Sequence, residues 1–212
     1  MGVEPWDEVR YARPMQDDAI PRLYLVAPPD LDAATIARAL DAGDVACILF
    51  TGADRDSKPL IQAAQARDVA ALVPDDADLA RRLGADGVHL GPGGDVATVR
   101  KRMGDDGIVG AACGESRHDA MIAGEAGADY VAFNGREGNP TLAADAGLLN
   151  WWQTMMTLPC VAMGRIGLAD VEAMARAGAD FVALDSAVWD HPANPAEAVA
   201  EANRRLDSLG EG

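Results

Sequence analysis

Short apolar runs rich in β-branched residues alternate with longer stretches rich in Ala and Leu along most of this chain. A short apolar run is typical of a buried strand, and the longer stretches repeat apolar residues at helical spacing. The pattern predicts strands near residues 22–27, 46–50, 70–73, 87–91, 108–112, 130–134, 160–164 and 181–185. It predicts helices at residues 31–42, 57–67, 76–83, 95–103, 116–126, 143–156, 168–177 and 195–208.

A Gly-Ala-Asp motif precedes alternate strands. It occupies residues 84–86, 127–129 and 178–180, and a weaker copy lies within residues 41–46. The copies are roughly 40 to 50 residues apart, which indicates a repeated structural unit. In each copy the glycine is suited to end a helix, the aspartate lies in a turn, and an apolar strand follows. The repeated unit is therefore a quarter of the fold.

Strict alternation of strands and helices predicts a parallel sheet with right-handed crossovers. Eight such units close most naturally into a single (β/α)8 barrel, which needs about 200 residues or more, and the chain has 212. An open, doubly wound sheet is the alternative. We expect the barrel to occupy residues 21–212. Residues 1–20 are expected to form an N-terminal extension that covers one end of it.

Side chains of a strand alternate between its two faces. On the fourth, sixth and eighth strands, the bulky face is expected to pack under the helices; it carries Val88, Leu90, Val131, Phe133, Val182 and Leu184. The small or polar face is expected to point into the barrel; it carries His89, Gly91, Ala132, Asn134, Ala183 and Asp185. The last inward positions open at the C-terminal end, where barrel enzymes place their sites.

Four residues are therefore candidates for catalysis: Asp75, His89, Asn134 and Asp185. Each has a structural alternative. His89 suits a hydrogen-bonded core histidine, and Asp75 suits a cap on the following helix. Asn134 suits a turn. Asp185 ends an apolar strand and needs a partner, for which Arg165 is the nearest candidate in strand order.

Composition narrows the classes of partner. The net charge of −16 argues against nucleic acid and against an anionic membrane surface. No apolar stretch reaches the roughly 20 residues that span a bilayer. The three cysteines, Cys47, Cys113 and Cys160, have no short spacing that would indicate a zinc site or a disulfide framework. A reducing, cytoplasmic location is expected.

Several motifs together resemble the thiamine phosphate synthase family and its thiazole tautomerase relatives, over roughly residues 21–209. The most specific stretch is Asp75–Ala80 followed by Gly84–Gly91. The others are Arg22–Val26, Ile108–Gly110, Gly127–Val131, Val161–Gly164 with Ile166, and Gly178–Asp180. The resemblance implies a transferase of thiamine biosynthesis that joins a hydroxymethylpyrimidine diphosphate to a thiazole phosphate and releases pyrophosphate.

The resemblance also implies a site. It implies Mg²⁺, with Asp75 as one ligand; Asp95 is the candidate for the second, but it is shifted by one residue and also suits a helix cap. It implies a site for a small phosphorylated heterocycle, built from backbone N–H groups near Gly164 and Ser186. Arg165 would favour a phosphate there, and Asp185 would oppose it.

Parts of the family pattern are missing. The family's Gln, Arg and Lys at alternate positions ending the second strand correspond to Ile48, Phe50 and Gly52, although Arg55 and Lys58 follow soon after. The serine of the fifth strand corresponds to Ala112. The Thr-Pro-Thr-Lys segment corresponds to residues 139–142, which lack its lysine, and the tautomerase histidine corresponds to Gly114.

Three functions stay open at this point. The first is the synthase reaction. The second is a non-catalytic paralogue that binds a thiamine-pathway compound or another small phosphorylated ligand. The third is a different reaction on an uncharged or cationic substrate, using Asp185, Asn134 and His89. Trp151 and Trp152 indicate an apolar patch, which is either packed against the barrel or part of a homo-oligomer contact.

Overall fold

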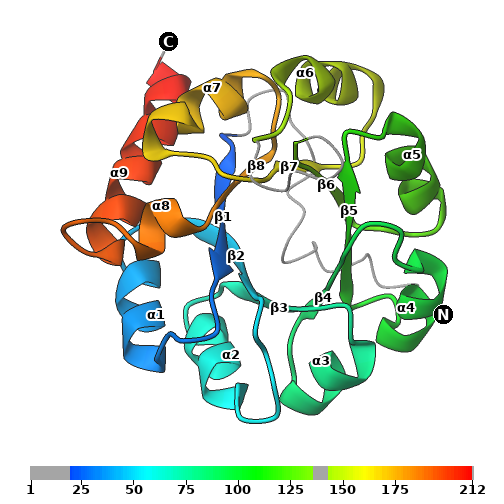
Figure 1. Cartoon of the computed structure of the whole chain (residues 1–212), viewed down its shortest axis with the longest axis horizontal. Coiled ribbons are helices and arrows are strands. Elements are labelled where there is room, and N and C mark those ends of the chain that lie inside the picture. Colours follow the sequence, from blue (N-terminus) through cyan, green and yellow to red (C-terminus); the bar gives the residue numbers. More distant parts are fainter. Residues whose placement is uncertain (1–19, 136–142, 212) are drawn as a thin grey trace, which may run out of the picture.

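The computed structural model describes residues 20–135 and 143–211, and in these ranges parallel strands form one closed barrel in sequence order (Figure 1). The strands are β1 Arg22–Ala27, β2 Val45–Phe50, β3 Ala70–Pro74, β4 Gly87–Leu90, β5 Ile108–Gly114, β6 Tyr130–Phe133, β7 Cys160–Ala162 and β8 Phe181–Leu184. The pairing of β1 with β8 closes the ring. The predicted barrel is thus confirmed, and the open sheet is wrong.

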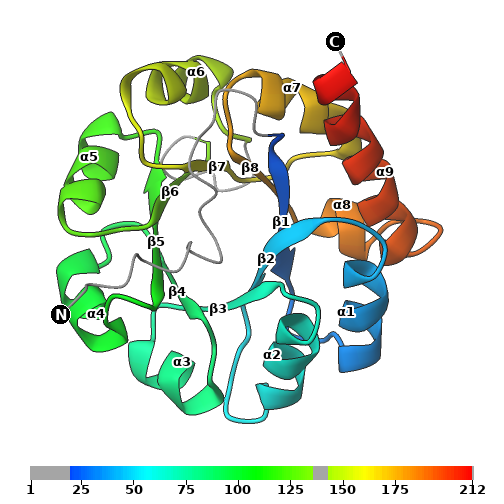
Figure 2. The same ribbon diagram turned by 180° about the vertical axis from the view of Figure 1, so that it is seen from behind.

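Helices surround the barrel on its outside (Figures 1 and 2). They are α1 Ala33–Leu40, α2 Lys58–Gln65, α3 Ala77–Leu83, α4 Val96–Met103, α5 Arg117–Glu125, α6 Ala146–Met155, α7 Val171–Arg176, α8 Ser186–Trp189 and α9 Pro195–Asp207, with 3-10 turns η1 Leu168–Asp170 and η2 Ser208–Glu211. Helix α8 was not predicted. In the described ranges, no helix has the length and apolar character to cross a bilayer.

Polar side chains fix where most helices begin. Each of six helices starts one residue after a side chain that accepts a hydrogen bond from a backbone N–H of the first turn; these caps are Asp32, Asp76, Asp95, Ser116, Asp145 and Asn194. Such caps satisfy N–H groups that have no partner within the helix. The predicted starts at 76, 95 and 116 counted the cap itself as helical.

The Gly-Ala-Asp motif joins neighbouring strands at the amino end of the barrel. The Oδ2 atoms of Asp86, Asp129 and Asp180 accept the N–H of Ala71, Val109 and Cys160 respectively, each at 2.7–2.8 Å. In the weaker copy, Asp44 instead pairs with the guanidinium of Arg22 at 2.6 Å. The motif is therefore structural: each aspartate ties the start of its own strand to the start of the preceding one.

Two apolar layers lie on either side of the strands. The layer under the helices includes the bulky positions predicted for it, Val88, Leu90, Val131, Phe133, Val182 and Leu184. The interior layer includes Tyr24, Leu72, Tyr130, Ala132, Val161 and Ala183. The predicted alternation of the fourth, sixth and eighth strands is confirmed.

Aromatic rings fill much of the interior because a neighbouring strand leaves room for them. A Cβ added to Gly110 on β5 would lie 2.0 Å from Cζ of Tyr130, so no larger residue fits beside this ring. Outside the strands, Trp152 is buried, and its Nε1–H donates to the carbonyl of Leu158 at 2.7 Å. Packing against the barrel is thus confirmed for Trp152, and a homo-oligomer contact stays a prediction.

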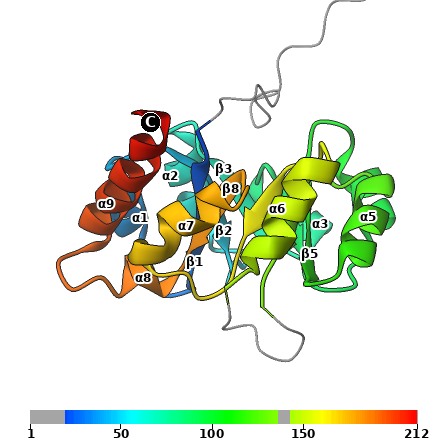
Figure 3. The same ribbon diagram turned by 90° about the horizontal axis from the view of Figure 1, so that it is seen from above.

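The side view separates the two ends of the barrel (Figure 3). Helix α8, which follows β8, lies at the carboxyl end, and the C-terminus lies at the opposite, amino end. Of the predicted N-terminal extension, residues 1–20, only Ile20 belongs to the described residues, so the expectation that it covers one end lies outside them.

Candidate functional site

The carboxyl end of the barrel carries the polar residues that the sequence singled out. Asp75 follows β3, Asn134 follows β6, Arg165 follows β7 by a short turn, and Asp185 follows β8. Parallel strands in a closed ring bring these positions to one rim, where barrel enzymes bind substrates. The rim is therefore the candidate site. Some of its residues have polar atoms that already form hydrogen bonds within the protein, and others have polar atoms that are free to contact a ligand.

Asp75 is held in an unusual backbone conformation. Its φ is 53°, in the left-handed region that residues other than glycine seldom adopt. Its Oδ1 accepts the N–H of Gly91 at 2.7 Å, and within the described residues its Oδ2 has no hydrogen-bond partner. Asp76, not Asp75, caps α3 through the N–H of Leu79. The capping interpretation of Asp75 is therefore wrong, and one of its carboxylate oxygens is available to a ligand.

Asp95 is fully engaged by its own helix. Its Oδ1 accepts the N–H of Thr98 at 3.0 Å, and its Oδ2 accepts the hydroxyl of Thr98 at 2.6 Å. These hydrogen bonds lower the pKa of the Asp95 carboxyl below its ordinary value. Asp95 therefore caps α4, which confirms the helix-cap alternative. Its hydrogen bonds to Thr98 disfavour a role as the second Mg²⁺ ligand.

The residues present fit Mg²⁺ only in a sparse arrangement. Across the described ranges, no cluster of three or more His, Cys, Asp or Glu side chains could hold a metal ion. Mg²⁺ is nevertheless often held by one or two carboxylates together with water and substrate phosphates. Asp75, with its free Oδ2, fits such a site, and Asp95 does not.

His89 lies below the rim, inside the barrel. It is 6% exposed, and its Nδ1 lies 2.8 Å from the hydroxyl oxygen of Tyr130, whose ring stacks on the imidazole. The Tyr130 hydroxyl is in turn 3.1 Å from that of Tyr24. Burial lowers the pKa of His89 to about 4, although the nearby Asp75 carboxylate opposes this shift. His89 is thus a neutral, hydrogen-bonded core residue, and its contact with substrate stays a prediction.

The Tyr24–Tyr130–His89 chain was missed at the level of sequence. The signal was present, because Tyr130 lies two positions before Ala132 and so shares its inward face. Tyr24 occupies the matching face of β1. The apolar character of the two strands gives no sign of how their phenol hydroxyls are paired, because the partners come from different strands.

Asn134 carries a polar atom without a partner. Its backbone N–H donates to the carbonyl of Gly114 at 3.2 Å, which extends the pairing of β5 with β6. Its side-chain Oδ1 is buried and accepts no hydrogen bond from any described residue. A buried amide oxygen left unpaired is costly. A ligand that donates to Oδ1 would remove that cost, so the atom is a candidate contact.

The turn after β7 combines a required glycine with a free cation. Gly164 has φ 107°, which favours glycine, and its carbonyl accepts the N–H of Ile166 at 2.9 Å. Arg165 projects from this turn, is exposed, and forms no ion pair with any described residue. The structural alternative for Asp185, an ion pair with Arg165, is therefore wrong, and the guanidinium is available to an anion.

The side chain of Asp185 accepts hydrogen bonds from Ser186, the residue that the resemblance expected to bind a phosphate. Its Oδ1 accepts both the backbone N–H of Ser186, at 2.6 Å, and the hydroxyl of Ser186, at 3.1 Å. It thereby caps the short helix α8. Within the described part of the chain, its Oδ2 has no hydrogen-bond partner. The two donors of Ser186 are already satisfied by a carboxylate.

The second strand offers no cation to a substrate. The resemblance placed the missing polar grip at Ile48, Phe50 and Gly52, but Ile48 and Phe50 pack under the helices. The residues of β2 that face the interior are Cys47 and Leu49. Ile48 and Phe50 therefore cannot occupy the positions of the family's inward-facing polar residues. The residues that do face inward, Cys47 and Leu49, carry no charge either.

Free cations instead follow β2. Arg55 and Lys58 are exposed and have no ion-pair partner among the described residues. The loop that carries them is ordered by Asp54, whose Oδ1 accepts the N–H of Asp56 at 2.9 Å and the hydroxyl of Ser57 at 3.0 Å. These two cations and Arg165 leave the carboxyl end with positive groups that are not neutralised.

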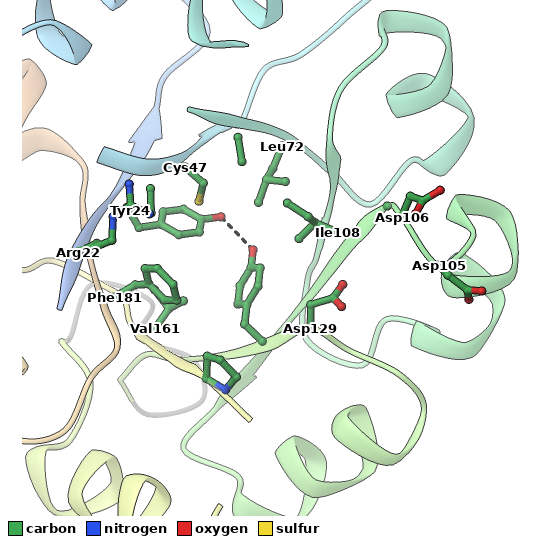
Figure 4. A pocket seen from close by; sticks show the side chains of 15 residues that line it. Arg22, Tyr24, Cys47, Leu72, Asp105, Asp106, Ile108, Asp129, Val161 and Phe181 are labelled. Atoms are coloured by element: carbon green, nitrogen blue, oxygen red, sulfur yellow. Dashed lines mark hydrogen bonds between the residues drawn. The ribbon is translucent and has the colours of Figure 1, made fainter. Parts of the chain in front are cut away.

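A cavity of about 250 Å³ lies at the other, amino end of the barrel (Figure 4). Its walls are mostly apolar and aromatic, and they include Tyr24, Cys47, Leu72, Ile108, Val161 and Phe181. Its polar groups largely satisfy one another: Tyr24 bonds Tyr130, and Arg22 pairs with Asp44. Because barrel enzymes bind substrates at the carboxyl end, we do not assign the chemistry to this cavity.

Comparison with known proteins agrees with this picture. A family model described as thiamine monophosphate synthase matches residues 23–188. The thiamine-phosphate synthase of Rhodospirillum centenum is 47% identical over 199 residues, covering 86% of this chain and 96% of that protein. The thiamine-phosphate synthase of Hyphomonas neptunium is 42% identical over 222 residues, covering 92% of this chain and 100% of that protein.

Among solved structures, thiamine phosphate pyrophosphorylase from Pyrococcus furiosus superposes with a TM-score of 0.78 at 23% identity, over 92% of this chain and 99% of that one. A geranylgeranylglyceryl phosphate synthase from Thermoplasma acidophilum superposes with a TM-score of 0.66 at 16% identity, over 89% and 94%. At such identities these structures bear on the fold alone, and both agree with the barrel.

Proposed function

Because this chain belongs to the thiamine monophosphate synthase family, we propose that its carboxyl-terminal rim couples a hydroxymethylpyrimidine diphosphate to a thiazole, as a step of thiamine biosynthesis. The proposal rests mainly on the backbone conformation and the free carboxylate oxygen of Asp75. Its backbone is held in the left-handed region, one carboxylate oxygen is fixed by Gly91, and the other is free at the rim. Strained, preorganised residues of this kind concentrate at functional sites.

The proposed reaction exchanges one bond for another. The thiazole ring nitrogen forms a bond to the methylene carbon of the pyrimidine, and the bond from that carbon to the diphosphate oxygen breaks. Pyrophosphate leaves with the electron pair, so no oxidant or reductant is needed. Negative charge builds on the leaving group, and catalysis depends on positive groups placed to stabilise it. Mg²⁺ held by Asp75 would supply part of that charge.

The chain's own cations are proposed to supply the rest. Arg55 and Lys58, unpaired and exposed after β2, replace the grip that the strand itself lacks. A charge-assisted contact of this kind contributes about 1.5–3 kcal/mol. Asn134 is proposed to accept a hydrogen bond from the bound substrate at its unpaired Oδ1. Asp75, Asn134 and the two cations thus orient the pyrimidine diphosphate.

An assay of pyrophosphate release tests the proposal. Purified protein receives the pyrimidine diphosphate and Mg²⁺, with thiazole phosphate or thiazole alcohol in separate arms. We expect pyrophosphate and a coupled product in stoichiometric amounts. Replacing Arg55 and Lys58 together with Ala should lower kcat/KM by at least about 100-fold, since two charge-assisted contacts of about 1.5–3 kcal/mol each are lost. Lys101→Ala removes an exposed lysine near the C-terminal end of α4, so it serves as the control and should leave kcat/KM unchanged.

The missing strand-two grip also favours a second candidate, a non-catalytic paralogue that binds a thiamine-pathway compound. Absence of pyrophosphate in both thiazole arms would overturn the coupling proposal and leave this candidate. A cytoplasmic location is a further part of the proposal, because Cys47, Cys113 and Cys160 are buried, free thiols, and free thiols are usual in a reducing compartment.

A further inference from the structure

A chain of hydrogen bonds crosses the barrel interior below the rim. The hydroxyl oxygens of Tyr24 and Tyr130 lie 3.1 Å apart (dashed line in Figure 4), and the Tyr130 hydroxyl oxygen lies 2.8 Å from Nδ1 of His89. The three residues are 1%, 7% and 6% exposed respectively. Polar groups in an apolar core cost free energy that Phe and Leu would not, so packing alone does not account for them.

The position of the Tyr130 hydroxyl is fixed by its surroundings. The phenol ring stacks on the imidazole of His89, with 5.8 Å between the ring centroids and 20° between the planes. A Cβ at Gly110 would lie 2.0 Å from Cζ of Tyr130, so the ring fills space that only a glycine leaves. The hydroxyl is therefore held at Nδ1 of His89, and the imidazole cannot flip without losing this bond.

The direction of the chain follows from where its protons can go. Burial raises the pKa of both phenols, so each hydroxyl keeps a proton that needs an acceptor. If Tyr24 donates to Tyr130 and Tyr130 donates to Nδ1, each proton meets an oxygen or a nitrogen. In the reverse direction, the remaining partner of the Tyr24 hydroxyl in the described chain is the Cys47 thiol, and sulfur is a weak acceptor. The first direction is therefore favoured, and it leaves the proton of the neutral imidazole on Nε2.

The imidazole of His89 lies close to Asp75. The backbone N–H of Asp75 donates to the carbonyl of His89 at 3.1 Å, and the Asp75 carboxylate raises the pKa of the imidazole against the larger effect of burial. A nearby carboxylate attracts an N–H and repels a nitrogen lone pair, which again favours the proton on Nε2. Among the described residues Nε2 has no hydrogen-bond partner, so its N–H is available to a ligand.

We propose that Tyr130, supported by Tyr24, is a positioning residue: its hydroxyl donates to Nδ1 of His89 and so directs the Nε2–H towards the rim, where it donates to an oxygen of the leaving diphosphate. The inference rests on the proposed function, because it needs the diphosphate beside Asp75. The hydrogen bond strengthens as negative charge builds on that oxygen, so it stabilises the transition state more than the bound substrate. The imidazole transfers no proton and stays neutral, and a neutral imidazole can still donate a hydrogen bond to a reacting group.

A double-mutant cycle tests whether Tyr130 acts through His89. Tyr130→Phe keeps the ring and removes only the hydroxyl, and His89→Leu removes the donor. We expect His89→Leu to lower kcat of pyrophosphate release by about 10- to 100-fold, the loss of one hydrogen bond to a charged group. Tyr130→Phe should lower kcat by about 10-fold and change KM by less than about 2-fold. In the His89→Leu background, Tyr130→Phe should have less than about a 2-fold further effect, because the residue that it positions is gone.

Magnetic resonance of isotope-labelled histidine nitrogens gives a readout that does not depend on turnover. At neutral pH the protonated and the bare nitrogen of an imidazole resonate far apart, and the signals of His89 are those lost in His89→Leu. We expect a protonated Nε2 and a bare Nδ1 in the wild type. Loss of the phenol donor in Tyr130→Phe should move the Nδ1 resonance. Adding the pyrimidine diphosphate with Mg²⁺, without a thiazole, should shift the Nε2–H resonance of the wild type.

Phe181→Leu is the matched control, because Phe181 packs against the same interior layer and has no side-chain polar atom that could join the chain. It should leave kcat and both imidazole resonances as in the wild type. A proton on Nδ1 in the wild type, an equal loss of kcat from Tyr130→Phe with and without His89, or an Nε2–H resonance that does not shift with the diphosphate would each overturn the inference.

The resonances separate this inference from the proposed function. If no pyrophosphate is released but the Nε2–H resonance shifts with the diphosphate and the Nδ1 resonance moves in Tyr130→Phe, the coupling proposal fails and the role of Tyr130 in orienting His89 stands. If pyrophosphate is released and Tyr130→Phe keeps the wild-type kcat, the coupling stands and the role of Tyr130 fails.

Discussion

Replacing Asp75 with Asn is expected to lower kcat/KM for the coupling reaction by roughly 100- to 1000-fold, the usual cost of removing one preorganised electrostatic group. The asparagine is close in size, and its amide oxygen still accepts the N–H of Gly91, which the aspartate accepts at 2.7 Å. Asparagine also tolerates the left-handed backbone that this position requires. The variant therefore removes the charge and keeps the geometry, and steady-state kinetics of pyrophosphate release measures the effect.

Asp76→Asn provides the control for this result. It removes a carboxylate from the adjacent residue, and asparagine caps a helix about as well as aspartate does, so the start of α3 is preserved. We expect wild-type kinetics from it. A wild-type kcat/KM in Asp75→Asn would show that the Asp75 carboxylate takes no part in the reaction. It would also contradict the proposal that the carboxyl-terminal rim is the active site.

Acid is expected to destabilise the fold through His89. The pKa of this buried imidazole is lowered from 6.5 to about 4, with burial as the main cause. Above pH 6.5 it is neutral in both the folded and unfolded states and has no effect. As the pH falls from 6.5 towards 4, the unfolded chain binds a proton that the folded protein does not, so unfolding is favoured. Below pH 4 the loss levels off, at about 3 kcal/mol.

Urea unfolding at several pH values, in wild type and in His89→Gln, measures this contribution. The difference in unfolding free energy between the two proteins should shift by about 3 kcal/mol across that window. His118 is exposed on the first turn of α5, so His118→Gln should keep the pH dependence of the wild type. Equal slopes for wild type and His89→Gln would mean that the imidazole binds a proton as readily in the folded protein as in the unfolded chain, which would contradict the lowered pKa.

The fold could be predicted because local features of the sequence determine it. Apolar runs and caps fixed the order of the elements, and Gly-Ala-Asp marked the even-numbered strands, where Asp86, Asp129 and Asp180 bond the preceding strand. Helix α8 escaped prediction because its four residues are too few to show helical periodicity. The cap that begins it was visible as Asp185 followed by Ser186.

The site was harder to predict from the sequence, because its geometry depends on contacts between segments that are distant in the sequence. Alternation placed Asp185 at the rim, but it could not show that the side chain turns back onto Ser186 instead of reaching Arg165. Asp75 and Asp76 are neighbours with the same side chain, and only the backbone conformation reveals which one caps α3. The resemblance matched the family's polar positions to Ile48 and Phe50, which lie on the outward face of β2. The strand is apolar on both faces, so its sequence has no alternation that could correct the match.

A crystal structure of the protein with bound pyrimidine diphosphate would decide most directly whether the carboxyl-terminal rim is the site. We expect the diphosphate at the carboxyl end, beside Asp75 and within reach of Arg55 and Lys58. Diphosphate density in the aromatic cavity at the amino end, or at the rim but away from Asp75, would contradict the assignment.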